Sequence, residues 1–129
     1  MTIDSYDPLQ PPDPAVWQEA SSEDRIRVVR AYHEAAGMSG SALTVHGGLH
    51  VTVENQIALN DPPIVAVKVQ QLMAQGLDRH QALHAVASVL IDHMRRMTAP
   101  GRRPMEREAL AEAYIGAVRR LNARKWLKS

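Results

Sequence analysis

Two pairs of histidines are the residues of this sequence whose type and spacing could do chemistry. His46 and His50 are four residues apart, as are His80 and His84. On an α-helix this spacing places both imidazoles on one face, about one turn apart. Two such pairs on neighbouring antiparallel helices would offer four nitrogens to one ion, and neutral imidazole suits several transition metals. The sequence therefore predicts a site for a divalent transition metal, with Zn as the first expectation and Fe, Ni or Mn as alternatives.

The histidines also lie where a helical core is expected. At about 100° per residue, His46 and His50 fall within one apolar stripe, and His80 and His84 flank another. The apolar residues of the two stripes are Leu43, Leu49, Val53 and Ile57, then Leu83, Ala87, Ile91 and Met94. His33 lies on a third stripe. Burying an imidazole is costly unless its nitrogens have partners, so five such histidines need a common explanation, which a metal ion or a shared polar cavity provides.

Two carboxylates are spaced to complete or orient such a site. Glu54 lies one turn beyond His50, and Asp92 lies two turns beyond His84, at the edge of that helix face. Either could ligate the ion, or could accept the second N–H of a ligating ring. His93 falls on the opposite side of its helix and is expected at the surface. The alternative interpretation of all these histidines is a hydrogen-bonded polar core without metal.

The elements that must position these residues are expected to be helices, because apolar residues recur at helical spacing along most of the chain. Asp61 and Asp78 are suited to cap helices, and Pro62 suits a first helical position. Five helices are predicted, with no strand. They start near residues 22, 41, 62, 79 and 104 or 105, and end near residues 36, 59, 75, 97 and 127.

The second of these helices carries a local conflict. The glycines of Gly47-Gly48 and the β-branched run Val51-Thr52-Val53 weaken a helix and would suit a strand. A strand, however, would scatter His46, His50 and Ile57 over both faces. Periodicity therefore favours a helix, in which the glycine pair would let a neighbouring backbone approach closely.

The predicted architecture is all-α: a five-helix, bundle-like single domain. The length of 129 residues suits one domain, at 15–129. Residues 1–14 are rich in proline and acidic residues, which predicts an irregular or disordered segment. This segment has no basic start and no apolar run, so it is not a signal peptide.

Composition narrows the class of protein further. The chain has no cysteine, which excludes disulfides, thiolate metal sites and cysteine nucleophiles. No stretch approaches the roughly 18 consecutive apolar residues that a membrane span needs. The expected location is the cytoplasm, with no membrane partner.

Charge is divided unevenly along the chain. Residues 95–129 hold ten Lys or Arg and three Glu, a local charge of +7, against −6 for residues 1–94. A basic end can contact phosphates, but Tyr114 and Trp126 are its only aromatic residues for base stacking. Nucleic acid is therefore an alternative partner and not the favoured one. A homodimer through the apolar stripe of the last helix is a second alternative.

Several blocks of the sequence resemble an uncharacterised bacterial family of small helical proteins, a domain of unknown function. The resemblance covers about half of the chain, from Tyr32 to Met94, and implies no known activity. Its blocks are Tyr32-His33-x-x-Ala36-Gly37, His46-x-x-x-His50-x-x-Val53-Glu54-Asn55-Gln56, Asp61-Pro62-Pro63 and Gly76-Leu77-Asp78-Arg79-His80-x-x-x-His84-Ala85-x-x-Ser88-Val89-Leu90.

Relatives in the resembled family tend to read His-Glu-x-x-His in the last block. That pattern has the spacing of zinc peptidases, in which the glutamate is the general base. Here Gln81 stands at the glutamate position, and an amide cannot take a proton from zinc-bound water. The preferred hypothesis is therefore a metal-binding protein, with the paired histidines as ligands. The alternatives are a non-enzymatic interaction module with a histidine-rich polar core, and a zincin-like hydrolase that lacks its usual base.

Overall fold

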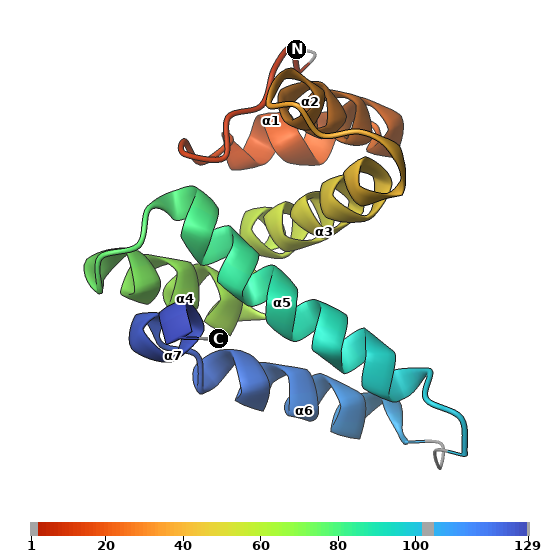
Figure 1. Ribbon diagram of the computed structural model, residues 1–129, viewed down its shortest axis with the longest axis vertical. Coiled ribbons are helices and arrows are strands. Elements are labelled where there is room, and N and C mark those ends of the chain that lie inside the picture. The colour runs from red at the N-terminus through yellow and green to blue at the C-terminus, as the bar shows by residue number, and fades with distance from the viewer. Residues whose placement is uncertain (1–2, 102–104, 129) are drawn as a thin grey trace. The chain divides into compact units, whose positions relative to one another are not determined.

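The computed structural model describes residues 3–101 and 105–128, and all the regular secondary structure in these ranges is helical (Figure 1). The all-α prediction is confirmed. The described residues form seven helices instead of five. They are α1 (Pro14–Glu19), α2 (Ser22–Ala35), α3 (Gly40–Leu59), α4 (Pro63–Ala74), α5 (Arg79–Met97), α6 (Arg107–Arg119) and α7 (Ala123–Lys128). No helix among the described residues is long and apolar enough to cross a membrane.

The chain divides into two compact units between Pro63 and Ile64. The first unit contains α1, α2 and α3, and the second contains α4 beyond its first residue, α5, α6 and α7. In the first unit α1 and α2 both pack against α3, and in the second α5 lies beside α6 (Figure 1). The domain predicted at 15–129 spans this boundary and stays a prediction.

Helix α1 was not expected, because it is only six residues long and follows a run of prolines. Asp13 is its N-cap, because the Asp13 carboxylate accepts hydrogen bonds from the backbone N–H groups of Ala15 and Val16. Pro14 takes the first helical position, where its missing N–H costs nothing. The first helix therefore begins at Pro14, before the start near Ser22 that the sequence predicts.

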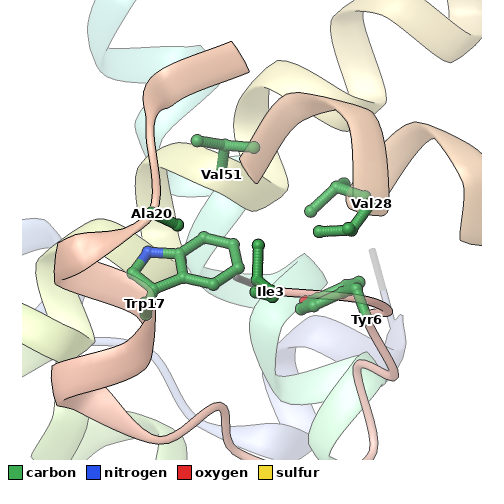
Figure 2. Close-up of a cluster of buried hydrophobic side chains, with 7 residues drawn as sticks. Ile3, Tyr6, Trp17, Ala20, Val28 and Val51 are labelled. Carbon is green, nitrogen blue, oxygen red and sulfur yellow. The ribbon is translucent and has the colours of Figure 1, made fainter. Parts of the chain in front are cut away.

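The hydrophobic core of the first unit joins the non-helical N-terminal segment to the helices. Ile3 and Tyr6 from that segment are buried against Trp17 of α1 (Figure 2). Val28 of α2 and Val51 of α3 belong to the same cluster. Ile3 and Tyr6 are each 7% exposed, so the segment before α1 is part of the packed unit.

Helix α3 is continuous through its glycine pair, as the histidine periodicity predicted. Gly47 is buried, and a methyl group added to it would lie 3.5 Å from Cγ of Arg30 on α2. That is an ordinary contact, so side chains of α2, and not a neighbouring backbone, approach Gly47. The helix ends at Leu59, and its C-cap residue Asn60 has a φ of 52°, in the left-handed region that terminates helices.

The last predicted helix is divided into α6 and α7, and α6 starts later than expected. It starts at Arg107 instead of Met105, and Pro104, the other predicted start, lies outside the described residues. It ends at Arg119, where Lys68 of α4 donates hydrogen bonds to the carbonyl oxygens of Arg119 and Leu121, both at 2.9 Å.

A new helix, α7, begins at Ala123, after three residues outside either helix. The Asn122 side chain accepts a hydrogen bond from the N–H of Lys125 at 2.8 Å, and Gln75 accepts one from the N–H of Ala123 at 2.8 Å. Both bonds satisfy N–H groups at the start of α7, which have no partner inside the helix.

Candidate metal centre

Three histidines from two helices gather in the first unit. His33 comes from α2, and His46 and His50 come from α3. Each offers one ring nitrogen, and these nitrogens lie within 4.8 Å of one another. The ring centroid of His33 is 4.6 Å from that of His46 and 4.6 Å from that of His50, and the two α3 rings are 5.0 Å apart. We call these three residues the histidine cluster.

The periodicity of α3 places His46 and His50 together, one turn apart on a face that α2 covers. Close packing of α2 on α3 then brings His33 against both rings. His33 and His50 are each 2% exposed, whereas His46 is half-buried. The cluster therefore has two enclosed imidazoles and one that reaches its edge.

The orientation of His33 is set by its own helix. Its Nδ1 lies 2.8 Å from the carbonyl oxygen of Val29, one turn earlier in α2. A carbonyl oxygen can only accept, so Nδ1 carries the hydrogen, and the lone pair of the neutral ring is on Nε2. Ligating histidines commonly use one ring nitrogen for the metal and the other N–H for a backbone carbonyl. The ring of Tyr32 stands edge-on to His33 at 5.1 Å and restricts it further.

The orientation of His50 is set by a chain of hydrogen bonds that includes a tyrosine. Nδ1 of His50 lies 3.1 Å from the hydroxyl of Tyr6, and that hydroxyl donates to Oε2 of Glu54 at 2.5 Å. Tyr6 belongs to the non-helical N-terminal segment, and Glu54 lies one turn after His50 on α3. All three residues are buried. Glu54, predicted as a ligand or an orienting group, thus contacts the cluster through Tyr6.

The donor set of the cluster fits a transition metal. Zinc binds imidazole nitrogen at 2.0–2.1 Å, so tetrahedral geometry needs nitrogens about 3.3 Å apart. Small side-chain rotations would bring nitrogens from within 4.8 Å to this separation. Three neutral imidazoles are also the number of protein ligands found at zinc sites that keep a fourth position for water. The histidine cluster could bind such an ion.

The second unit carries the other predicted pair. His80 and His84 lie one turn apart on α5 with ring centroids 4.3 Å apart, and both are half-buried. Their rings thus stand together on one face, as the spacing predicts. They offer two nitrogens, which is fewer than a metal site of protein ligands needs by itself.

Asp92, by contrast, is engaged with a neighbouring cation. It is exposed, and its carboxylate forms an ion pair with Arg96 at 3.0 Å on the same helix. It is not among the residues whose ligand atoms gather. His93 is half-buried, with its ring 5.5 Å from that of Tyr114, and it is likewise outside the gathered residues.

Gln81, which stands where the resembled pattern has a catalytic glutamate, has a structural role. Its side-chain oxygen accepts from the backbone N–H of Asp78 at 2.9 Å, and its backbone N–H donates to the Asp78 carboxylate at 2.7 Å. This reciprocal pair is a capping box at the start of α5. Gln81 therefore stabilises the start of α5, the helix that carries His80 and His84.

Two residues of the site were not assigned from the sequence. His33 was placed on an apolar stripe, which is the signal that could have included it among the ligands. Tyr6 gave no signal, because it stands in a segment whose sequence indicates irregular structure and because its partners are 44 and 48 residues away.

Comparison with known proteins identifies a matching protein family. A protein family described as a domain of unknown function (DUF1841) matches residues 19–120. This range includes the histidine cluster and the pair on α5, but not Tyr6. No curated protein and no solved structure matches the chain.

Proposed function

The chain belongs to the DUF1841 family, a domain of unknown function, and we propose that it binds a divalent transition metal ion through its histidines. The observation that carries the proposal is the histidine cluster, in which three imidazole nitrogens lie within 4.8 Å of one another. The hydrogen bond between His33 and the Val29 carbonyl leaves the lone pair of that ring on Nε2, where a metal ion could bind. Zinc is the ion that this donor set fits best.

The pair His80 and His84 is part of the proposal on the strength of its spacing. Glu54 enters as a group that orients His50 through Tyr6. Asp92 stays a predicted ligand, although it pairs with Arg96. The role of the ion, structural or catalytic, depends on whether a coordination position stays open to water.

The first test is metal content. Untagged protein would be purified without immobilised metal and analysed by elemental mass spectrometry. We expect close to one equivalent of a single transition metal, Zn before Fe, Ni or Mn. A His46→Ala/His50→Ala variant should lose it. His93→Ala is the matched control, because it removes a half-buried imidazole outside the cluster, and it should keep the ion.

A second double variant tests whether His80 and His84 are ligands. If His80→Ala/His84→Ala also loses the metal, both pairs bind the same ion, as the sequence pattern predicts. If it leaves the content unchanged, the ligands are those of the first unit alone. Wild-type protein that holds no metal, and takes up none when Zn, Fe, Ni or Mn is added, would contradict the proposal. It would favour the alternative, an interaction module whose histidines form a polar core.

A further inference from the structure

The hydrogen-bonded chain of Glu54, Tyr6 and His50 points beyond the presence of a metal. We propose that Tyr6 and Glu54 are positioning residues of the metal site, which fix His50 in the tautomer that binds the ion. This inference rests on the proposed function. It makes the N-terminal segment before α1 a component of the metal site instead of a lead-in to the helices.

The proton count along the chain gives the tautomer. The Tyr6 hydroxyl has one hydrogen, and it donates this hydrogen to Oε2 of Glu54. The contact between Tyr6 and His50, 3.1 Å long, must then run in the other direction, with Nδ1–H of His50 as the donor. The lone pair of His50 is therefore on Nε2, the same arrangement that the Val29 carbonyl imposes on His33. Two rings of the cluster are thus prepared for the ion in the same way.

Burial keeps water away from the hydrogen-bonded chain of Glu54, Tyr6 and His50. The exposed fractions are 7% for Tyr6, 2% for His50 and 1% for Glu54, so bulk water is not at hand to replace a lost partner. Without the Tyr6 hydroxyl, His50 loses the acceptor that holds the hydrogen on Nδ1. The ring could then carry its hydrogen on Nε2, where it would compete with the metal.

Tyr6 is itself held by its surroundings. Its ring packs with Trp17 at a centroid distance of 6.0 Å and stands edge-on to Tyr32 at 6.2 Å. Ile3, three residues earlier, is buried in the same core, and its carbonyl oxygen accepts from Arg27 of α2 at 3.3 Å. A phenylalanine at position 6 would keep these ring contacts and remove only the hydroxyl, which separates positioning from packing.

The test uses Tyr6→Phe and Glu54→Gln in the full chain. Zinc affinity would be measured by competition with a chromophoric chelator. Tyr6→Phe should weaken binding by about 10- to 100-fold, the usual effect of removing a partner that orients a metal ligand. Glu54→Gln keeps an acceptor oxygen for the Tyr6 hydroxyl and should lose less. Tyr114→Phe removes a buried phenol hydroxyl in the second unit and should bind zinc like the wild type.

A second measurement needs no metal. Nitrogen-15 NMR of the imidazoles in the metal-free protein reports which ring nitrogen carries the hydrogen. His50 should be the Nδ1–H tautomer in the wild type and in Glu54→Gln, and should lose this preference in Tyr6→Phe. A general loss of stability would not change the tautomer of one ring in folded protein.

The outcomes separate the two proposals. If the wild type binds zinc and Tyr6→Phe binds it equally well, the positioning role is overturned while metal binding stands. If wild-type His50 carries its hydrogen on Nε2, the positioning role is overturned directly. If the wild type binds no metal, both proposals fail. Weaker binding in Tyr6→Phe together with the changed tautomer supports the inference.

Discussion

The ammonium group of Lys68 donates a hydrogen bond to the carbonyl oxygen of Arg119 at 2.9 Å, across 51 residues of sequence. A second bond of the same length reaches the carbonyl of Leu121. The Lys68 side chain is buried although it is charged. The last carbonyls of a helix have no partner inside it, and a cation near them is favourable. Lys68 therefore caps the end of α6 from a distant helix and fixes α4 to it.

Replacing Lys68 by methionine should destabilise the second unit. The substitution keeps most of the aliphatic stem but removes both hydrogen bonds, which leaves carbonyl oxygens without their donor. The expected loss in the free energy of unfolding is about 1–3 kcal/mol, measured by urea denaturation followed by circular dichroism. Lys125→Met, at an exposed position of α7, should change stability by less than about 0.5 kcal/mol. Equal effects of the two substitutions would contradict the capping role.

The same lysine predicts a dependence of stability on pH. Burial lowers the pKa of Lys68 below its ordinary value of 10.5, which is the value it has in the unfolded chain. Between the folded pKa and 10.5 the unfolded chain binds more protons, so the free energy of unfolding contributed by this group rises with pH across that window. It is constant below the folded pKa, where both states are charged. Subtracting the pH profile of Lys68→Met from that of the wild type should give this rise, and a fall would contradict it.

Asn55 joins the three helices of the first unit. Its side-chain oxygen accepts from Nε1 of Trp17 on α1 at 2.8 Å and from the guanidinium of Arg25 on α2 at 3.0 Å. Asn55→Ala should cost about 1–3 kcal/mol, because it leaves the N–H of a buried indole without an acceptor. Asn55→Asp keeps an acceptor oxygen and should recover most of the loss. If Asn55→Asp were as unstable as Asn55→Ala, packing and not hydrogen bonding would explain the effect.

Alanine substitutions at two glycines of the first unit should change its stability in opposite directions. Gly48 lies inside α3, and a methyl group added to it would meet nothing within 4 Å. Gly48→Ala should raise the free energy of unfolding by about 0.5–1 kcal/mol, because glycine is a poor helix former. Gly37 follows α2 with φ of 97°, so Gly37→Ala should destabilise by about 1 kcal/mol or more. Thermal unfolding monitored by circular dichroism would compare them, and a stabilising Gly37→Ala would be inconsistent with the backbone conformation.

The helices predicted most accurately are those whose boundaries depend on nearby residues. Arg79 and Met97 were expected to bound the fourth helix and do bound α5, because Asp78 caps it and the apolar repeat is regular. The break between α6 and α7 could not be foreseen. The apolar stripe continues to Leu121, beyond the end of α6, and the hydrogen bonds at the break come from Lys68, which is distant in sequence.

The same distinction applies to the site. Spacing within one helix identified His46 and His50, and the structure places their rings together. Tyr6 joins them through the packing of a non-helical segment, which no local pattern encodes. His33 shows the intermediate case, since its apolar stripe indicated the core but could not say which face of α3 it would meet.

Metal binding should also stabilise the protein against unfolding, because the ligands gather only in the folded chain. At a free ion concentration 100 times the dissociation constant, the expected gain is about 2.7 kcal/mol. Zinc should therefore raise the melting temperature in calorimetry, and a chelator should reverse the rise. His33→Ala removes one ligand of the histidine cluster and should reduce the rise strongly, whereas His93→Ala should leave it intact. An equal rise in both variants would exclude His33 from the ligands. The ligands of the first unit would then be the two histidines of α3, whose one-turn spacing is visible in the sequence.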